Sequence, residues 1–132
     1  MGNIIFIDQE HEDFYSRYLI KCRQQDVYHM ALVYCLGLNI DTRININSIY
    51  DFRTGKIKTD CLHEEWITSG SGKIIRIAFN LYNDGIPSLY NYDEESEQLQ
   101  ECGRYTIAKI FSCKYAKYFL EAIRIRYPEY CS

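Results

Sequence analysis

The chain contains segments in which apolar residues recur with helical spacing, separated by short polar breaks. The first predicted helix begins after Asp8, which has the character of an N-cap, and runs to about Arg23. Its buried stripe, at i, i+3, i+4 and i+7, is Tyr15, Tyr18, Leu19 and Cys22. A second helix is predicted from Asp26 to Gly37, with the same spacing at Tyr28, Ala31, Leu32 and Cys35. Two helices with so short a link are expected to pack antiparallel.

A third apolar segment predicts the central helix of the fold, at about 71–84. Its apolar residues cover an arc of about 200° on a helical wheel. They are Ile74, Ile75, Ile77, Ala78, Phe79, Leu81 and Tyr82. A Ser/Gly-rich break at 68–72 is expected to precede this helix, and Asn83-Asp84-Gly85 to close it.

The segments around these helices give weaker patterns. Residues 41–49 read either as a third helix, capped by Asp41-Thr42, or as a strand, because three isoleucines stand among asparagines. A turn is predicted at 53–56 and one or two helical turns at 60–66. The last helix should stop just before Pro128, because proline disfavours helical geometry in the residue before it. Its apolar face is Tyr115, Phe119, Ala122 and Ile123.

Residues 86–105 combine Pro87 with an acidic run that contains no basic residue between Asp93 and Glu101. This pattern predicts a flexible, solvated acidic loop, with a frayed helix as the alternative. The whole pattern predicts an all-α fold, a compact bundle of five or six helices in which residues 1–132 form one domain.

Composition narrows the possible functions. The 132 residues are 47% apolar and 25% charged, with a net charge of −3, which is typical of a globular protein rather than of a polycation that coats nucleic acid. No stretch approaches the roughly 18–20 apolar residues of a membrane span, and the start lacks the pattern of a signal peptide, so we expect a cytoplasmic protein. The six cysteines lack zinc-ligand spacing. We therefore expect reduced thiols, no metal and no cofactor.

One candidate ligand site precedes the predicted central helix. Backbone amides at a helix N-terminus, together with basic side chains, attract phosphate and other anions. The candidate anion-binding residues are Thr68, Ser69, Ser71, Lys73 and Arg76. The segment is not a Walker A loop, because Ile67 and Ile74 stand where that motif requires Gly and Ser or Thr. The alternative is a capped loop beside a solvated basic helix face.

Catalytic candidates are few. Cys61, His63 and Glu64 are the only grouping with nucleophile and base character. The second histidine of a metalloprotease His-Glu-x-x-His helix would fall at Ile67. Side chains two residues apart also point in different directions on a helix or a short turn. These residues support an enzyme only as the third hypothesis.

The end of the chain combines aromatic and basic residues. Thirteen of the residues are tyrosines and one is a tryptophan, and from residue 102 onward six basic residues face two acidic ones. Tyrosine beside Lys or Arg can contact a protein or stack on nucleobases. The predicted interaction surface is Tyr115, Lys117, Tyr118, Arg124, Arg126 and Tyr127. The alternative is the ordinary solvated side of a bundle.

Several segments carry a family resemblance, which covers most of the chain except about 86–105. They are Phe6–Tyr15, Asp26–His29, Tyr50–Phe52, Cys61–Ser71, Arg76–Asn83 and Tyr115–Tyr130. In these segments the sequence resembles a small uncharacterised family of cytosolic proteins encoded by prophages and conjugative elements of Firmicutes. The resemblance implies an accessory factor that binds a host or defence component, and it supplies no functional residues.

The leading hypothesis is therefore a small non-enzymatic binding protein of a prophage or mobile element, an anti-defence inhibitor of the anti-CRISPR kind that acts by contact with a host or defence-system protein. The alternative is a nucleotide or signal-molecule binding protein that uses residues 68–76. Direct nucleic-acid binding and a homodimer stay open, and no membrane partner is expected.

Overall fold

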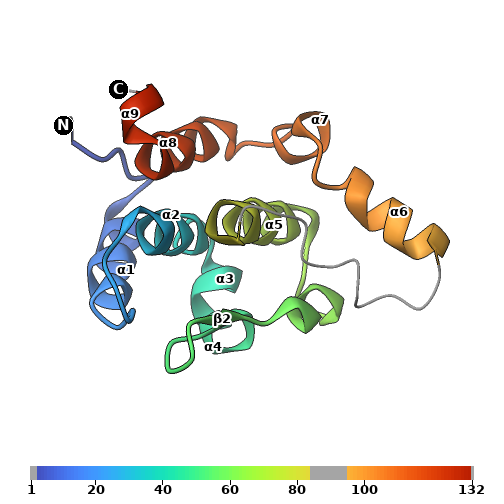
Figure 1. The fold of residues 1–132 in the computed structure, drawn as a ribbon, viewed down its shortest axis with the longest axis horizontal. Coiled ribbons are helices and arrows are strands. Elements are labelled where there is room, and N and C mark those ends of the chain that lie inside the picture. The colour runs from blue at the N-terminus through green and yellow to red at the C-terminus, as the bar shows by residue number, and fades with distance from the viewer. Residues whose placement is uncertain (1–2, 84–94, 132) are drawn as a thin grey trace.

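The computed structural model describes residues 3–83 and 95–131 (Figure 1). The described residues are mostly helical, with one small two-stranded sheet, so the predicted all-α fold is confirmed. The elements are α1 (Gln9–Leu19), α2 (Val27–Leu36), α3 (Ile40–Ile44), α4 (Ile46–Ile49), β1 (Tyr50–Asp51), β2 (Lys56–Ile57), the 3-10 helix η1 (Thr59–His63), α5 (Ser69–Asn83), α6 (Glu95–Gly103), α7 (Ile107–Ile110), α8 (Ala116–Arg126) and α9 (Pro128–Cys131).

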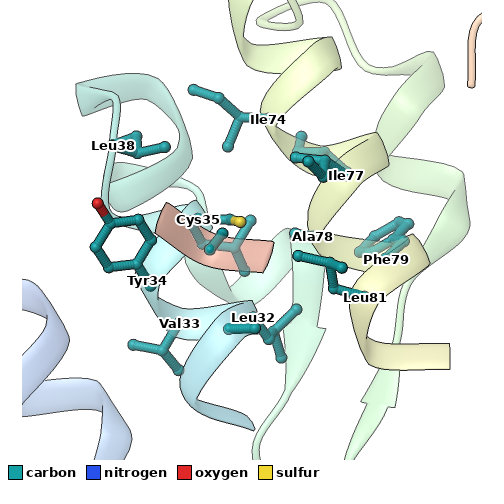
Figure 2. Packing of buried hydrophobic residues seen from close by; sticks show 14 of the residues in the cluster. Leu32, Val33, Tyr34, Cys35, Leu38, Ile74, Ile77, Ala78, Phe79 and Leu81 are labelled. Atoms are coloured by element: carbon teal, nitrogen blue, oxygen red, sulfur yellow. The ribbon is translucent and has the colours of Figure 1, made fainter. Parts of the chain in front are cut away.

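Helix α2 packs against α1, α5 and α8 at once (Figure 1). All six residues from Ala31 to Leu36 are buried, so this helix has no solvated side over its second half. Figure 2 shows Leu32 and Cys35 on the side of α2 that faces Ala78 of α5. Helix α5 is buried as predicted, and α2 joins it at the centre of the core. Each fully buried aliphatic side chain in this contact contributes about 1.5–3 kcal/mol.

The predicted N-caps of α1 and α2 are confirmed. The Asp8 carboxylate accepts the backbone N–H of His11 at 2.9 Å, and that of Asp26 accepts the N–H of His29 at 3.0 Å. Helix α1 ends at Leu19, earlier than the predicted Arg23. Of its predicted stripe, Tyr15 and Cys22 are buried, while Tyr18 and Leu19 are half-buried.

Gly37 ends α2, as predicted, but for a different physical reason. Its φ is −84°, which any residue can adopt, so no left-handed conformation requires a glycine here. A Cβ at this position would instead stand 2.8 Å from both His11 Cδ2 and Phe14 Cδ1. The missing side chain therefore allows α1 to approach the end of α2 closely.

Residues 39–57 form two short helices and a β-hairpin, so the helical reading of 41–49 holds. The cap of α3 is Asn39, whose side chain accepts the N–H of Asp41, and not Asp41-Thr42. Thr42 is buried and donates its hydroxyl to the Leu36 carbonyl at 2.7 Å. The predicted turn at 53–56 joins β1 to β2 and contains Gly55 at φ +73°, a conformation that favours glycine.

The predicted acidic loop is in part a helix. Residues 86–94 of it lie outside the described residues, while the part from Glu95 to Gly103 forms α6. The expectation that this acidic run is solvated is wrong for Glu101, which is fully buried. In the described parts of the chain, every helix is too short or too polar to cross a bilayer.

His11 is buried between the N-terminal segment and α2. Its Nδ1 accepts the backbone N–H of Ile7 at 3.1 Å, so its Nε2 is the atom that donates to the Tyr34 carbonyl, at 2.7 Å. Burial lowers the pKa of His11, and the nearby Arg43 acts in the same direction, although the Tyr34 carbonyl and Asp8 oppose it. The folded protein therefore holds a neutral imidazole.

We expect Gly37→Ala to destabilise the protein by about 1–3 kcal/mol, the usual cost of an overpacked core site. The added methyl group would meet two ring atoms of α1 at 2.8 Å. Urea unfolding monitored by circular dichroism measures the change. Gly103→Ala is the control, because its Cβ would meet no atom within 4 Å, and it should alter stability by less than about 0.5 kcal/mol. Equal effects of the two substitutions would contradict the close approach of α1.

We expect the free energy of unfolding to decrease as the pH falls from about 7 to 5. The unfolded chain, in which His11 has its ordinary pKa of 6.5, takes up a proton in this range more readily than the folded protein does. The slope is limited to about 1.4 kcal/mol per pH unit for one proton. Asp26, Glu101 and Glu121 have lowered pKa values in the folded protein, so the stability they contribute is lost only below about pH 5, where these carboxylates begin to bind protons in the unfolded chain.

Urea denaturation at several pH values measures this slope. His11→Gln should be less stable at neutral pH and should lose most of the pH dependence between 7 and 5. The control is His63→Gln, at an exposed position, and this variant should keep the pH dependence of the wild-type protein. A slope that is unchanged in His11→Gln would show that another group causes it.

Candidate functional site

A groove of about 750 Å³ lies between the N-terminal half of α5, the end of α6 and α7. Helix α5 meets here the segment from α6 to α7, which follows much later in the sequence. Its lining residues are Ser69, Lys73, Arg76, Gln100, Gly103, Arg104, Ala108, Lys109 and Ser112. Four of these nine side chains are basic, and none is acidic.

Helix α5 presents one side of the groove because its polar residues share a face. Ser69, Lys73 and Arg76 follow one another at intervals of four and three residues, which places them on the same side of a helix. The opposite side of α5 is held in the core by residues such as Ile74 and Ala78, both fully buried. The rotation of the basic face toward the groove is thus fixed by the packing of the apolar face.

The Ser/Gly-rich break predicted at 68–72 is helical from Ser69 onward, because α5 begins at that residue. The Thr68 N–H donates to Ser71 Oγ at 2.8 Å, and the Ser71 N–H donates to Thr68 Oγ1 at 3.1 Å. The two residues thus satisfy each other's backbone N–H groups at the start of the helix, in the manner of a capping box. Of the five predicted anion-binding residues, Ser69, Lys73 and Arg76 line the groove, whereas Thr68 and the buried Ser71 form this cap.

Glu101 of α6 connects two of the basic residues. Its carboxylate accepts from Arg76 Nε at 2.8 Å and Nη2 at 3.1 Å, and from Arg104 Nη1 at 2.9 Å. Burial of this side chain would by itself raise the pKa of Glu101, but the hydrogen bonds and charges of the two arginines hold that pKa below its usual value. The carboxylate is therefore ionised, and it fixes the position of both guanidinium groups.

Two lysines complete the groove. Lys73 Nζ donates to the Ser112 carbonyl at 2.9 Å, which links α5 to the segment after α7. Lys109 is exposed at the end of α7. Among the ion pairs formed by the described residues, neither lysine takes part. Sequence reasoning did not place Arg104 and Lys109 at this site, although the excess of basic residues after position 102 was a partial signal.

The predicted interaction surface at the end of the chain needs correction. Tyr115 is buried, and its hydroxyl accepts from Asn39 Nδ2 at 2.8 Å. Arg126 is also buried: its Nε donates to the Leu81 carbonyl at 2.9 Å, and its guanidinium lies 3.7 Å from the centre of the Tyr28 ring. Both side chains hold α8 in the bundle, because the amphipathic helix turns them inward.

The other members of that surface are more accessible. Lys117 is exposed, with its ammonium 5.8 Å from the ring of the half-buried Tyr118. Arg124 is held by Glu121 through two hydrogen bonds, of 2.7 and 2.8 Å. Tyr127 is half-buried, and its ring lies 4.4 Å from the Arg126 guanidinium. This leaves a smaller and less basic surface than the sequence predicts.

The structure does not assemble the predicted Cys/His/Glu grouping. Cys61 is buried, and burial raises the pKa of its thiol to about 12, so the reactive thiolate is disfavoured at neutral pH. His63 and Glu64 are both exposed. Within the described residues, no three His, Cys, Asp or Glu side chains are grouped so that they could hold a metal ion.

Comparison with known proteins gives a family but no activity. No match was found among the curated proteins or among the solved structures. One family model matches residues 1–132, and its description is "Family of unknown function (DUF6075)". The resemblance to an uncharacterised family is thereby confirmed. Because the match spans the whole sequence, the chain belongs to this family of unknown function.

Proposed function

We propose that the protein is a non-enzymatic binding protein that takes a phosphate-bearing ligand into the groove between α5, α6 and α7. The observation that carries this proposal is the convergence of four basic side chains on one groove, where Glu101 is the one carboxylate paired with them among the described residues. Like charges brought together in this way repel one another, and a bound anion relieves the repulsion.

The chemistry of the lining favours phosphate as the anion. Arg104 presents a planar fork of donors beside the point charges of Lys73 and Lys109, and both kinds of cation are the usual protein ligands of phosphate. Ser69, the first residue of α5, adds a hydroxyl. The volume of about 750 Å³ lies in the range of small-molecule sites, which supports the hypothesis of a nucleotide or signal molecule.

A second candidate function is contact with a protein, and a different surface supports it. Ile40 and Ile44 are 57% and 71% exposed, and both line a groove of about 350 Å³ between α1 and α3. The rim contains the ion pair between Glu10 and Arg43, with 3.1 Å between Oε2 and Nη2. An apolar centre with a charged rim is typical of protein interfaces. In this form the protein would be a mobile-element inhibitor of a defence component, as the sequence hypothesis holds.

The first proposal predicts that phosphorylated small molecules raise the melting temperature of the wild-type protein. Lys73→Ala, Arg104→Ala and Lys109→Ala should each weaken binding by about tenfold or more, because each removes a charge-assisted hydrogen bond. Thermal shift assays and isothermal titration calorimetry provide the measurements. Lys117→Ala, an exposed lysine on α8, is the matched control and should bind normally. A protein that binds no compound of a broad phosphate panel would contradict the proposal.

The second function predicts that a charge placed on the α1–α3 groove abolishes anti-defence activity. Plaque formation by a phage on a host whose defence system restricts it measures this activity when the protein is expressed there. Ile44→Glu should lower plaque numbers by about tenfold or more, because a desolvated carboxylate in the contact costs several kcal/mol. Ile20→Glu, at a site 77% exposed outside the groove, is the control. Equal activity of both variants would contradict this function.

A further inference from the structure

We infer that the ligand of the basic groove is an oligophosphate group that the protein recognises by its charges, without contact to a nucleobase. This inference rests on the proposed phosphate-binding function and adds the chemical class of the ligand. Three features of the groove carry it: its unbalanced charge, the distribution of its cations over separate elements, and the composition of its lining.

The charge of the groove exceeds that of one phosphate group. Four basic side chains line it, and Glu101 neutralises one of them, which leaves three positive charges. A single phosphate monoester carries about 1.5 to 2 negative charges at pH 7. Two or three linked phosphoryl groups supply the three or more negative charges that balance the groove.

The cations also stand on different elements. Lys73 and Arg76 lie on α5, Arg104 directly follows α6, and Lys109 lies on α7. Lys73 bonds across to the Ser112 carbonyl, beyond the end of α7, so the ammonium already bridges two walls. A ligand that contacts the cations of all three elements must extend across a groove of about 750 Å³. A linear chain of phosphoryl groups has that form.

The described residues that line the groove provide no aromatic surface on which a base could stack. Proteins hold nucleobases by stacking them on aromatic side chains and by hydrogen bonds to their edges. None of the nine lining residues is aromatic, and Gln100 is the one amide among them. The ring of Tyr115 lies next to Gly70, near the start of α5, but it is buried. The groove therefore distinguishes ligands by the number of phosphoryl groups.

Titration calorimetry of the full-length protein tests this inference. The probes are orthophosphate, pyrophosphate, tripolyphosphate, ATP, UTP and adenosine, all in buffer without divalent cations. We expect tripolyphosphate to bind at least about tenfold more tightly than orthophosphate, because it engages more of the charge-assisted contacts. ATP and UTP should match tripolyphosphate within about threefold, since their bases add nothing, and adenosine should not bind.

Variants and salt show whether the stated cations are responsible. Lys109→Met should lower the affinity for tripolyphosphate by at least about fivefold, and it should make that affinity less dependent on ionic strength. Lys114→Met, an exposed lysine outside the groove, is the control and should preserve both values. Because both substitutions are at exposed positions, we expect folded variants.

The results separate this inference from the function on which it rests. Equal affinities for orthophosphate and tripolyphosphate would overturn the oligophosphate assignment and leave the phosphate site intact. ATP or UTP binding at least about tenfold more tightly than tripolyphosphate would also overturn it, because the source of the phosphates would then be a recognised nucleotide. A failure of every phosphate compound to bind would contradict the site itself.

Discussion

The enclosure of α2 is the constraint on which the rest of the fold depends. A helix that is apolar around its whole circumference must be covered on every side, and here α1, α5 and α8 provide the cover. The absence of a side chain at Gly37 allows α1 to approach the end of α2 closely. The contact with α5 sets the rotation of that helix about its axis. Because α5 carries the basic groove residues on its other side, burial in the core also determines where Lys73 and Arg76 point.

The elements around the groove are joined in part by polar contacts. Helix α6 meets α5 through the ion pair between Glu101 and Arg76, and α7 meets it through Ile110, which is buried. Lys73 adds a hydrogen bond to the chain after α7. Polar contacts of this kind do not close a gap as aliphatic packing does, since their partners are few and directional. The groove of about 750 Å³ therefore remains open between the three elements.

Local rules predicted the parts of the structure that depend on neighbouring residues. The Asp8 and Asp26 caps and the turn at Gly55 each involve a few adjacent positions, and all are present. The burial of every residue from Ala31 to Leu36 was not predicted, because helical spacing identifies one stripe and cannot show how many neighbours a helix has. The cap formed by Thr68 and Ser71 was mistaken for a loop, since Ser and Gly are common in both.

In the candidate site, too, the sequence predicted the residues that belong to one local pattern and missed those that only the fold brings close. Ser69, Lys73 and Arg76 were predicted because they belong to one helix and a local anion-binding pattern. Arg104 lies at the end of the segment 86–105, whose composition predicted a solvated loop, and Lys109 follows that segment. Their place in the groove depends on contacts across the bundle, above all on Glu101, which lies 25 residues after its partner Arg76. Composition can show a basic surplus in a segment, but only the fold shows which side chains face one another.

The ion pair between Glu101 and Arg76, beside the groove, has a cost in stability that the proposed binding function would explain. Glu101 has lost all contact with solvent, and the cost of removing a carboxylate from water offsets much of its attraction to two arginines. Apolar side chains in place of both Glu101 and Arg76 would hold α6 against α5 about as well. Only a carboxylate such as that of Glu101 can also hold two guanidinium groups beside Lys73 and Lys109. The arrangement buries a charge and holds two guanidinium groups in place, so that binding of the proposed anion would cost less entropy for ordering them.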